Sequence, residues 1–154
     1  MKMELRRILL VEDNPNDVEL VLEGLGEYNL ANEVVVARDG VEALDYLHRT
    51  GAFADRDGGN PAVVLLDLKL PKVDGIEVLK TIKHDEKLML VPVVVLTSSR
   101  EERDLVESYR LGVNAYVVKP VDFHEFARAV KELGIFWAII NEPPPGSIKN
   151  PKMK

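Results

Sequence analysis

The sequence predicts a single α/β domain built on a doubly wound, five-stranded parallel sheet. Short apolar runs recur along the chain, and stretches with apolar residues at spacings of three and four separate them. Strict alternation of strands and helices requires parallel strands joined by right-handed crossovers, with helices on both faces of the sheet. We expect the flavodoxin-like strand order 2-1-3-4-5, one of the common orders for such sheets.

The expected strands are the five apolar runs, each rich in β-branched residues or leucine and too short for a helix. They cover residues 8–11, 34–37, 62–66, 93–96 and 115–118. Before the third strand, residues 51–61 form a polar, Gly-rich connection. We expect one domain over residues 1–140, followed by a polar, Pro-containing tail over residues 141–154.

Five helix starts are marked by a capping side chain followed three residues later by a carboxylate. The cap accepts a hydrogen bond from an unpaired backbone N–H, and the carboxylate suits the positive end of the helix dipole. Pro15 supports the first start, and Gly112 is the expected stop of the fourth helix. The pairs are Asn14/Asp17, Asp39/Glu42, Asp74/Glu77, Ser99/Glu102 and Asp122/Glu125.

Composition narrows the range of functions. With 46% apolar and 30% charged residues, the 154-residue chain is typical of a globular protein. A net charge of -6 gives no general attraction to nucleic acid, and the absence of cysteine excludes thiolate catalysis. No apolar run approaches the ~20 residues that cross a bilayer, and the first residues lack an apolar signal core. We therefore expect a cytoplasmic protein that binds neither DNA nor membrane.

Polar residues follow four of the five predicted strands, at the carboxyl edge where open α/β sheets bind ligands. The first strand ends in Glu12 and Asp13, the third in Asp67, the fourth in Thr97 and the fifth in Lys119. Three converging carboxylates repel one another, and their hard oxygens suit Mg2+. A hydroxyl and a lysine suit phosphoryl oxygens, so the set predicts phosphoryl transfer to a carboxylate.

Five short motifs in register resemble the receiver domains of two-component response regulators over about residues 5–134. The resemblance implies that Asp67 is phosphorylated and that Glu12, Asp13, Asp67 and the backbone carbonyl of Lys69 bind Mg2+. Glu12 stands where the family more often has Asp, which leaves open whether it binds the ion directly or through water. The motifs are Ile8-Leu9-Leu10-Val11-Glu12-Asp13-Asn14, Leu65-Leu66-Asp67-Leu68-Lys69-Leu70-Pro71, Asp74-Gly75, Leu96-Thr97-Ser98 and Val118-Lys119-Pro120.

The same resemblance assigns roles to the last two strands. Thr97 and Lys119 would hold the phosphoryl oxygens, and the bond between Lys119 and Pro120 is expected to be cis, although most such bonds are trans. Tyr116 is either a core-edge aromatic or, with Thr97, the conformational switch that receivers use. The chain would then signal through protein contacts, without an output domain or an enzymatic activity of its own.

The implied partners are a sensor histidine kinase and a downstream target or phosphotransfer protein. Glu12-Asp13, the long 51–61 connection and Phe136-Trp137 also resemble the receivers that serve bacterial phytochrome kinases. Three alternatives compete with this interpretation. An aspartate-nucleophile phosphatase would need Asp-x-Asp after the first strand, and a flavin-binding protein is disfavoured because Glu12 and Asp13 would repel the flavin phosphate. The third alternative is a receiver-like binding module that is never phosphorylated.

The C-terminal end of the last helix predicts self-association. Phe126, Val130, Leu133, Trp137 and Ile140 form one apolar helical face toward the sheet. Apolar side chains also project at other angles, from Ile135, Phe136 and Ile139. One face of the sheet cannot cover these in addition to the first set. A homodimer would bury these three residues, and the alternative is that the Pro143–Pro145 tail folds back over this end.

Overall fold

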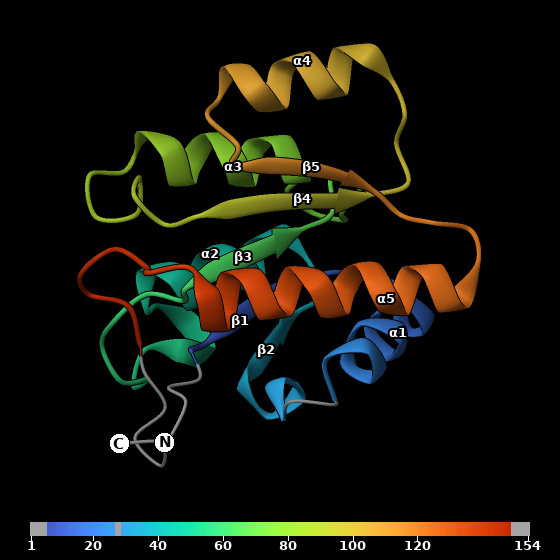
Figure 1. The fold of residues 1–154 in the computed structure, drawn as a ribbon. Helices are drawn as coiled ribbons and strands as arrows, with labels where there is room; N and C mark the ends of the chain where they lie inside the picture. Colours follow the sequence, from blue (N-terminus) through green and yellow to red (C-terminus); the bar gives the residue numbers. More distant parts are fainter. Residues whose placement is uncertain (1–5, 27–28, 149–154) are drawn as a thin grey trace.

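The computed structural model describes residues 6–26 and 29–148, which form a five-stranded parallel sheet in the order β2-β1-β3-β4-β5 (Figure 1). This confirms the predicted doubly wound fold and strand order. The strands are β1 (Ile8–Val11), β2 (Val34–Ala37), β3 (Val63–Leu66), β4 (Val93–Thr97) and β5 (Ala115–Val118). The helices are α1 (Pro15–Leu25), α2 (Gly40–His48), α3 (Gly75–His84), α4 (Glu102–Arg110) and α5 (Phe123–Gly134), with shorter turns at η2 (Leu30–Glu33), η3 (Gly51–Phe53) and η4 (Ile135–Ile140).

The three central strands are buried along their whole length, whereas the two edge strands are mostly half-buried. In β1, Leu10 pairs with Val36 of β2 on one side and with Leu65 of β3 on the other. β-Branched and leucine side chains pack well on both faces of such a sheet. Because all strands run in parallel, their carboxyl ends lie along one edge.

Two cores cover the two faces of the sheet. Leu9 and Val11 of β1 belong to the core beneath α2 and α3, whereas Ile8 and Leu10 belong to the core beneath α1 and α5. This alternation follows from the two-residue period of a strand. In Figure 1, α1 and α5 lie together on one face, and α4 lies at the outer edge of the sheet beside β5.

Four of the five predicted helix starts are confirmed by side-chain caps, each worth about 1 kcal/mol. Asn14 accepts from the N–H groups of Asn16 and Asp17, and the other three caps each accept from the residue three positions later. These three are Asp39, Asp74 and Asp122. Gly112, at φ 94°, stands where the fourth helix was expected to stop.

The predicted start at Ser99 is wrong, because α4 begins at Glu102 after Glu101, which has no side-chain cap. The Ser99 hydroxyl instead donates to Asp104 Oδ2 at 2.6 Å and accepts from the N–H of Glu101 at 3.3 Å. Because the hydroxyl donates to a side chain in the first turn of α4 and accepts within a local turn, it does not cap the helix.

After α5 the chain continues into the π-helical turn η4, where the N–H of Asn141 donates to the carbonyl of Phe136 at 2.6 Å. The wider turn rotates the side chains relative to an α-helix. Ile140, expected on the core face, is 66% exposed, whereas Ile139, expected to be uncovered, packs against the core. Both expectations are therefore wrong, while Phe136 is exposed as expected.

The described part of the C-terminal tail returns to the loop before β3. The N–H of Asn60 donates to the carbonyl of Gly146 at 2.8 Å, and the N–H of Ile148 donates to the carbonyl of Asn60 at 2.7 Å. These bonds fix the tail at the amino edge of the sheet. Within residues 6–26 and 29–148, none of the helices has the length and apolar character needed to span a bilayer.

Candidate phosphoacceptor site

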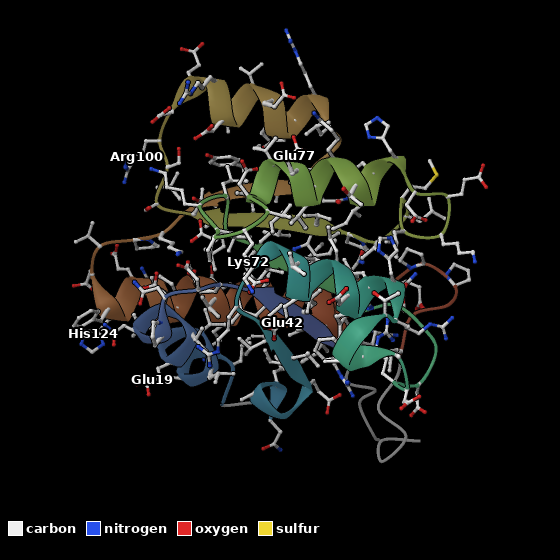
Figure 2. All side chains as sticks on the ribbon, turned by 180° about the vertical axis from the view of Figure 1, so that it is seen from behind. Glu19, Glu42, Lys72, Glu77, Arg100 and His124 are labelled. Atoms are coloured by element: carbon white, nitrogen blue, oxygen red, sulfur yellow. The ribbon has the colours of Figure 1, made fainter. Side chains whose placement is uncertain are left out.

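The predicted site residues lie at the carboxyl edge of the sheet. Glu12 and Asp13 follow β1, Asp67 follows β3, and Lys119 follows β5. Thr97 is the last residue of β4 and pairs with Val118. In Figure 2, Arg100 after β4 and His124 at the start of α5 lie on this same side of the molecule.

Three carboxylates form a compact cluster at this edge. One oxygen from each of Glu12, Asp13 and Asp67 lies within 4.8 Å of the others. Glu12 and Asp67 are buried, at 2% and 7% exposure, whereas Asp13 is exposed. Packing like charges this closely is unfavourable unless a cation compensates them.

Lys119 is one such cation, because its ammonium nitrogen lies 2.5 Å from Glu12 Oε1, 2.8 Å from Asp17 Oδ2 and 3.0 Å from Asp67 Oδ2. The lysine side chain is only 8% exposed. The expected cis bond between Lys119 and Pro120 is wrong, because the described residues contain no cis peptide. The ammonium reaches the cluster across a trans bond, which is the form that X-Pro bonds favour by about 0.5–1 kcal/mol.

The ionisation of the cluster reflects its burial. Burial raises the pKa of Glu12 to about 7, and the charge of Asp67 adds to this rise, while the hydrogen bond from Lys119 opposes it. Burial alone would lower the pKa of Lys119, but its hydrogen bonds to Asp17 and Glu12 and the charge of Asp67 outweigh that effect and raise it. The lysine therefore stays charged as long as these carboxylates surround it.

Backbone groups hold the two buried carboxylates in place. The N–H of Asn14 donates to Glu12 Oε2 at 3.2 Å, and the N–H of Lys69 donates to Asp67 Oδ1 at 3.2 Å. Gly75, at the start of α3, packs directly on the backbone of Asp67, since a Cβ there would lie 2.3 Å from the Asp67 carbonyl oxygen. Only glycine permits this approach, which fixes α3 beneath the loop carrying Asp67.

Thr97 and Tyr116 both form hydrogen bonds to Ser99 in the turn after β4. Thr97 is fully buried, and its Oγ1 accepts from the N–H of Ser99 at 3.3 Å. The Tyr116 hydroxyl donates to the carbonyl of Ser99 at 3.1 Å. Among the described hydrogen bonds, none joins Thr97 to Asp67, so the turn at Ser99 is what links the two proposed switch residues.

Asp17 is a site residue that the sequence prediction did not include. It was interpreted only as the partner of the Asn14 cap, yet its carboxylate contacts Lys119 at 2.8 Å. The available signal was its place in the first turn of α1, directly after the segment that carries Glu12 and Asp13.

The assembled groups can bind a divalent cation and a phosphoryl group. The site suits a hard divalent cation, because three carboxylates converge there and two of them are buried. Lys119 reaches the same space with a mobile positive charge suited to phosphoryl oxygens. The coordination by the Lys69 carbonyl remains a prediction.

Comparison with known proteins gives a family match over most of the chain. The family of the response regulator receiver domain matches residues 8–131. Response regulator Rcp1 of Synechocystis is 41% identical over 130 residues, which are 84% of this chain and 87% of Rcp1. Its Mn2+-bound crystal structure superposes with a TM-score of 0.84 at 39% identity, covering 90% of this chain and 99% of that one.

Two further solved structures are similar. The phosphorylated cyanobacterial phytochrome response regulator RcpA has a TM-score of 0.85 at 42% identity, covering 91% of this chain and 99% of RcpA. The bacteriophytochrome response regulator AtBRR is 68% identical with a TM-score of 0.71, covering 90% of this chain and 99% of AtBRR. The resemblance to phytochrome-associated receivers predicted from Glu12-Asp13 and the 51–61 connection is confirmed.

Proposed function

The chain belongs to the response regulator receiver domain family of two-component signalling, and from this premise we propose that Asp67 is its phosphoacceptor. The observation that carries the proposal is the position of Asp67 within the carboxylate cluster, with Lys119 at 3.0 Å. The match to the receiver domain family and to response regulator Rcp1 supports a response regulator rather than a classical enzyme.

In the proposed reaction, a carboxylate oxygen of Asp67 attacks the phosphorus of a phosphohistidine on a sensor kinase. A P–O bond forms, the P–N bond to the histidine breaks, and the product is an aspartyl phosphate. The transferred group passes through a state with charge spread over its oxygens, so catalysis depends on positioning and on positive charge. Lys119 can provide that charge, because its ammonium already lies against Asp67.

The proposed cofactor is Mg2+, held by Glu12, Asp13, Asp67 and the backbone carbonyl of Lys69. When bound, the ion would neutralise charge on the carboxylates and on the phosphoryl oxygens. The exposed side of the cluster, at Asp13, would leave room for the waters that Mg2+ retains. Support comes from the convergent carboxylates and from Rcp1, which was crystallised with Mn2+.

Thr97 is proposed to donate to a phosphoryl oxygen and so to carry the signal. Its hydroxyl now accepts from the Ser99 N–H, and Tyr116 donates to the Ser99 carbonyl. Turning the Thr97 hydroxyl toward a phosphoryl group would break the first of these bonds and free the turn. Tyr116 could then adopt a new rotamer, which would alter the surface beside α4.

The proposed partners are a phytochrome-type sensor histidine kinase and a downstream protein, meeting in the cytoplasm, where the kinase has access to ATP. Relatives named as phytochrome or bacteriophytochrome response regulators support the kinase class. A homodimer is proposed to bury Phe136, which is 46% exposed, with Ile135 at its margin. Ile139 packs into the chain's own core and would contribute little.

Asp67→Asn tests the phosphoacceptor. We expect wild-type protein given acetyl phosphate and Mg2+ to gain the mass of one phosphoryl group, in an adduct lost in base, and we expect the variant to gain none. Asp74→Asn is the matched control, because Asp74 only caps α3 and asparagine caps about equally well. Equal labelling of Asp67→Asn and wild type would refute the assignment.

Phe136→Asp tests the dimer by sedimentation. We expect wild type to associate at high micromolar concentration and the variant to remain a monomer, because a carboxylate in an apolar interface is costly. Val121→Asp is the control, since Val121 is 93% exposed on a different surface. A wild type that stays monomeric, or a variant that still dimerises, would contradict this interface.

A further inference from the structure

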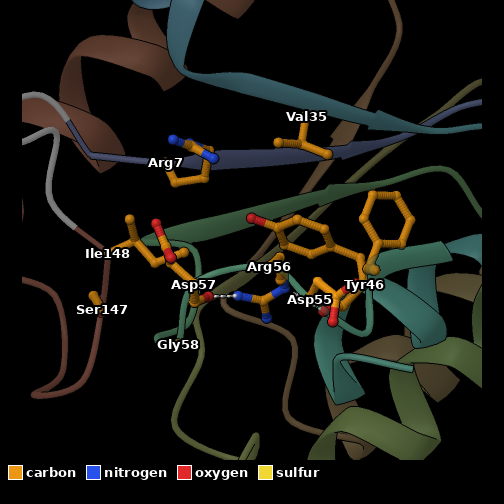
Figure 3. A pocket seen from close by; sticks show the side chains of 10 residues that line it. Arg7, Val35, Tyr46, Asp55, Arg56, Asp57, Gly58, Ser147 and Ile148 are labelled. Carbon is orange, nitrogen blue, oxygen red and sulfur yellow. Dashed lines mark hydrogen bonds between the residues drawn. The ribbon is translucent and has the colours of Figure 1, made fainter. Parts of the chain in front are cut away.

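The amino edge of the sheet contains an open pocket of about 850 Å3 (Figure 3). Its walls come from segments far apart in the sequence: the residue before β1, β2, α2, the loop before β3 and the C-terminal tail. β1 begins beside this pocket and ends at Glu12, so the pocket and the phosphoacceptor site lie at opposite ends of the same strand. The lining residues are Arg7, Val35, Tyr46, Phe53, Asp55, Arg56, Asp57, Gly58, Ser147 and Ile148.

Two hydrogen-bond donors in this pocket are buried without a partner. They are the hydroxyl of Tyr46, a residue only 2% exposed, and the Nε of Arg7. Buried polar atoms are nearly always hydrogen-bonded, so two exceptions in one pocket require an explanation. Figure 3 shows the Tyr46 hydroxyl pointing across the pocket to the side where Arg7 and Ile148 lie. Both groups can donate, and together they call for a hydrogen-bond acceptor.

One positively charged residue of the pocket, Arg7, has no ion-pair partner within the described part of the chain, although Asp55 and Asp57 line the same pocket. Among the described residues, Arg49, which lies outside the lining but close to Gly58, forms no ion pair either. Burial lowers the pKa of Arg56, and the positive charges of Arg49 and Arg7 lower it further against the opposing effect of Tyr46. An acceptor bound here would therefore be favoured if it carried negative charge.

Arg56 builds the wall of the pocket rather than offering free donors. Its Nε donates to the carbonyl of Tyr46 at 2.7 Å, and its Nη1 donates to the carbonyls of Asp57 and Gly59. The guanidinium also stacks on the Tyr46 ring, at 4.2 Å from the ring centroid. These contacts hold the ring in one orientation, so the hydroxyl is fixed in the pocket and not free to turn toward solvent.

The remaining walls restrict the size and charge of a ligand. Val35, Phe53 and Ile148 provide apolar surface. Asp55 and Asp57 are exposed at the pocket and would repel a ligand with several negative charges, such as a nucleotide or polyphosphate. The chemistry that fits is one negative charge on an apolar body.

We propose that this pocket binds a small organic carboxylate, whose oxygens accept from the Tyr46 hydroxyl and the Arg7 Nε and whose apolar body contacts Val35, Phe53 and Ile148. Such a ligand would bridge β1, α2 and the C-terminal tail, because each contributes a contact.

The first experiment compares 3-phenylpropionate with its uncharged amide by NMR titration of the full chain. We expect the acid to bind with a dissociation constant of about 1–10 mM, the range that a ligand of roughly ten non-hydrogen atoms reaches, and the amide to bind at least ~10-fold more weakly. Amide shifts should concentrate in residues 46–58 and 146–148. Equal affinity of acid and amide, or no shift at about 20 mM, would overturn the proposal and leave water as the occupant.

The second experiment locates the ligand with two variants and two controls. Tyr46→Phe removes only the unpartnered hydroxyl, so the chain should fold normally, and we expect binding of 3-phenylpropionate to weaken at least ~5-fold. Arg7→Gln should weaken it by a similar factor. Tyr109→Phe and Arg128→Gln change the same residue types at exposed positions on α4 and α5 and should leave it unchanged. Unchanged affinity in both pocket variants would refute the site.

Discussion

Helix α4 and the pair formed by α1 and α5 are attached to the sheet in very different ways. Within α4 only Ser108 is buried, and its hydroxyl has no partner, while Leu105, Val106 and Tyr109 are exposed. α1 and α5 instead pack against each other and against the sheet. A Cβ on Gly24 would lie 2.7 Å from the Ala127 carbonyl, which shows how closely these two helices approach.

This contrast places the adjustable part of the molecule beside β4 and β5. Thr97 and Tyr116 hold the turn that leads into α4, and little apolar burial fixes the helix after that turn. Regions with few buried apolar contacts have the lowest free energy of local unfolding. The α1 and α5 face provides a rigid support against which α4 can move.

Hydrogen exchange gives the largest expected difference between the two regions. Protected amides of α5 should exchange at least ~100-fold more slowly than those of α4, because α5 opens only with the core. On phosphorylation, exchange should change across residues 97–116 and stay constant in α1. Equal protection of α4 and α5 would remove the basis of the comparison, and constant exchange across residues 97–116 would contradict the proposed switch.

Truncating one valine in each region is the next test. Val130→Ala in α5 removes two methyl groups from a fully buried position and should lower the free energy of unfolding by about 2–3 kcal/mol. Val106→Ala in α4, where the side chain is 42% exposed, should cost less than about 0.5 kcal/mol. Urea unfolding measures both, and similar costs would show that α4 is anchored after all.

Two glycines at the end of α1 test how closely α1 packs against α5. Gly24→Ala places a methyl group against the Ala127 backbone, and the strain should exceed the gain in helix propensity, for a net loss of about 1–2 kcal/mol. Gly26→Ala meets nothing within 4 Å and should stabilise by about 0.5 kcal/mol. Thermal unfolding of both variants should therefore shift in opposite directions.

The smallest effect is expected at Ser108 in α4. Ser108→Ala removes a buried hydroxyl that has no hydrogen-bond partner, so the free energy of unfolding should change by less than about 0.5 kcal/mol or increase. Ser147→Ala is the control, because its hydroxyl donates to the Pro144 carbonyl at 2.8 Å and should cost about 0.5–1.5 kcal/mol. A larger loss at Ser108 than at Ser147 would mean that the buried hydroxyl has a partner in solution.

The features predicted correctly from the sequence depend on neighbours in the sequence. Strands such as Ile8–Val11 are marked by their own apolar residues, and caps such as Asp39 and Asp122 act within three positions. The site could be predicted because parallel strands end at one edge, so Glu12, Asp13 and Asp67 had to meet. These inferences need little knowledge of side-chain packing.

The features that were missed or wrong depend on local geometry that the residue pattern does not specify, or on contacts between distant segments. Ser99 fails as a cap because its hydroxyl donates to the Asp104 side chain in the first turn of α4, and the π-helical turn changes which of Ile139 and Ile140 is buried. The pocket around Tyr46 needs the C-terminal tail, whose pairing with Asn60 has no local sequence signal. Charge and periodicity alone do not encode such pairings.

The contacts of Lys119 also determine when during folding the site can exist. The lysine is separated from Glu12 by 107 residues, from Asp17 by 102 and from Asp67 by 52. Contacts of such high sequence separation carry a large loop-closure entropy and form late. Until β5 docks at the edge of the sheet, the carboxylates lack this counter-ion. A partly folded or freshly synthesised chain would therefore hold an incomplete phosphoacceptor, and competence to be phosphorylated would report that the last strand is in place.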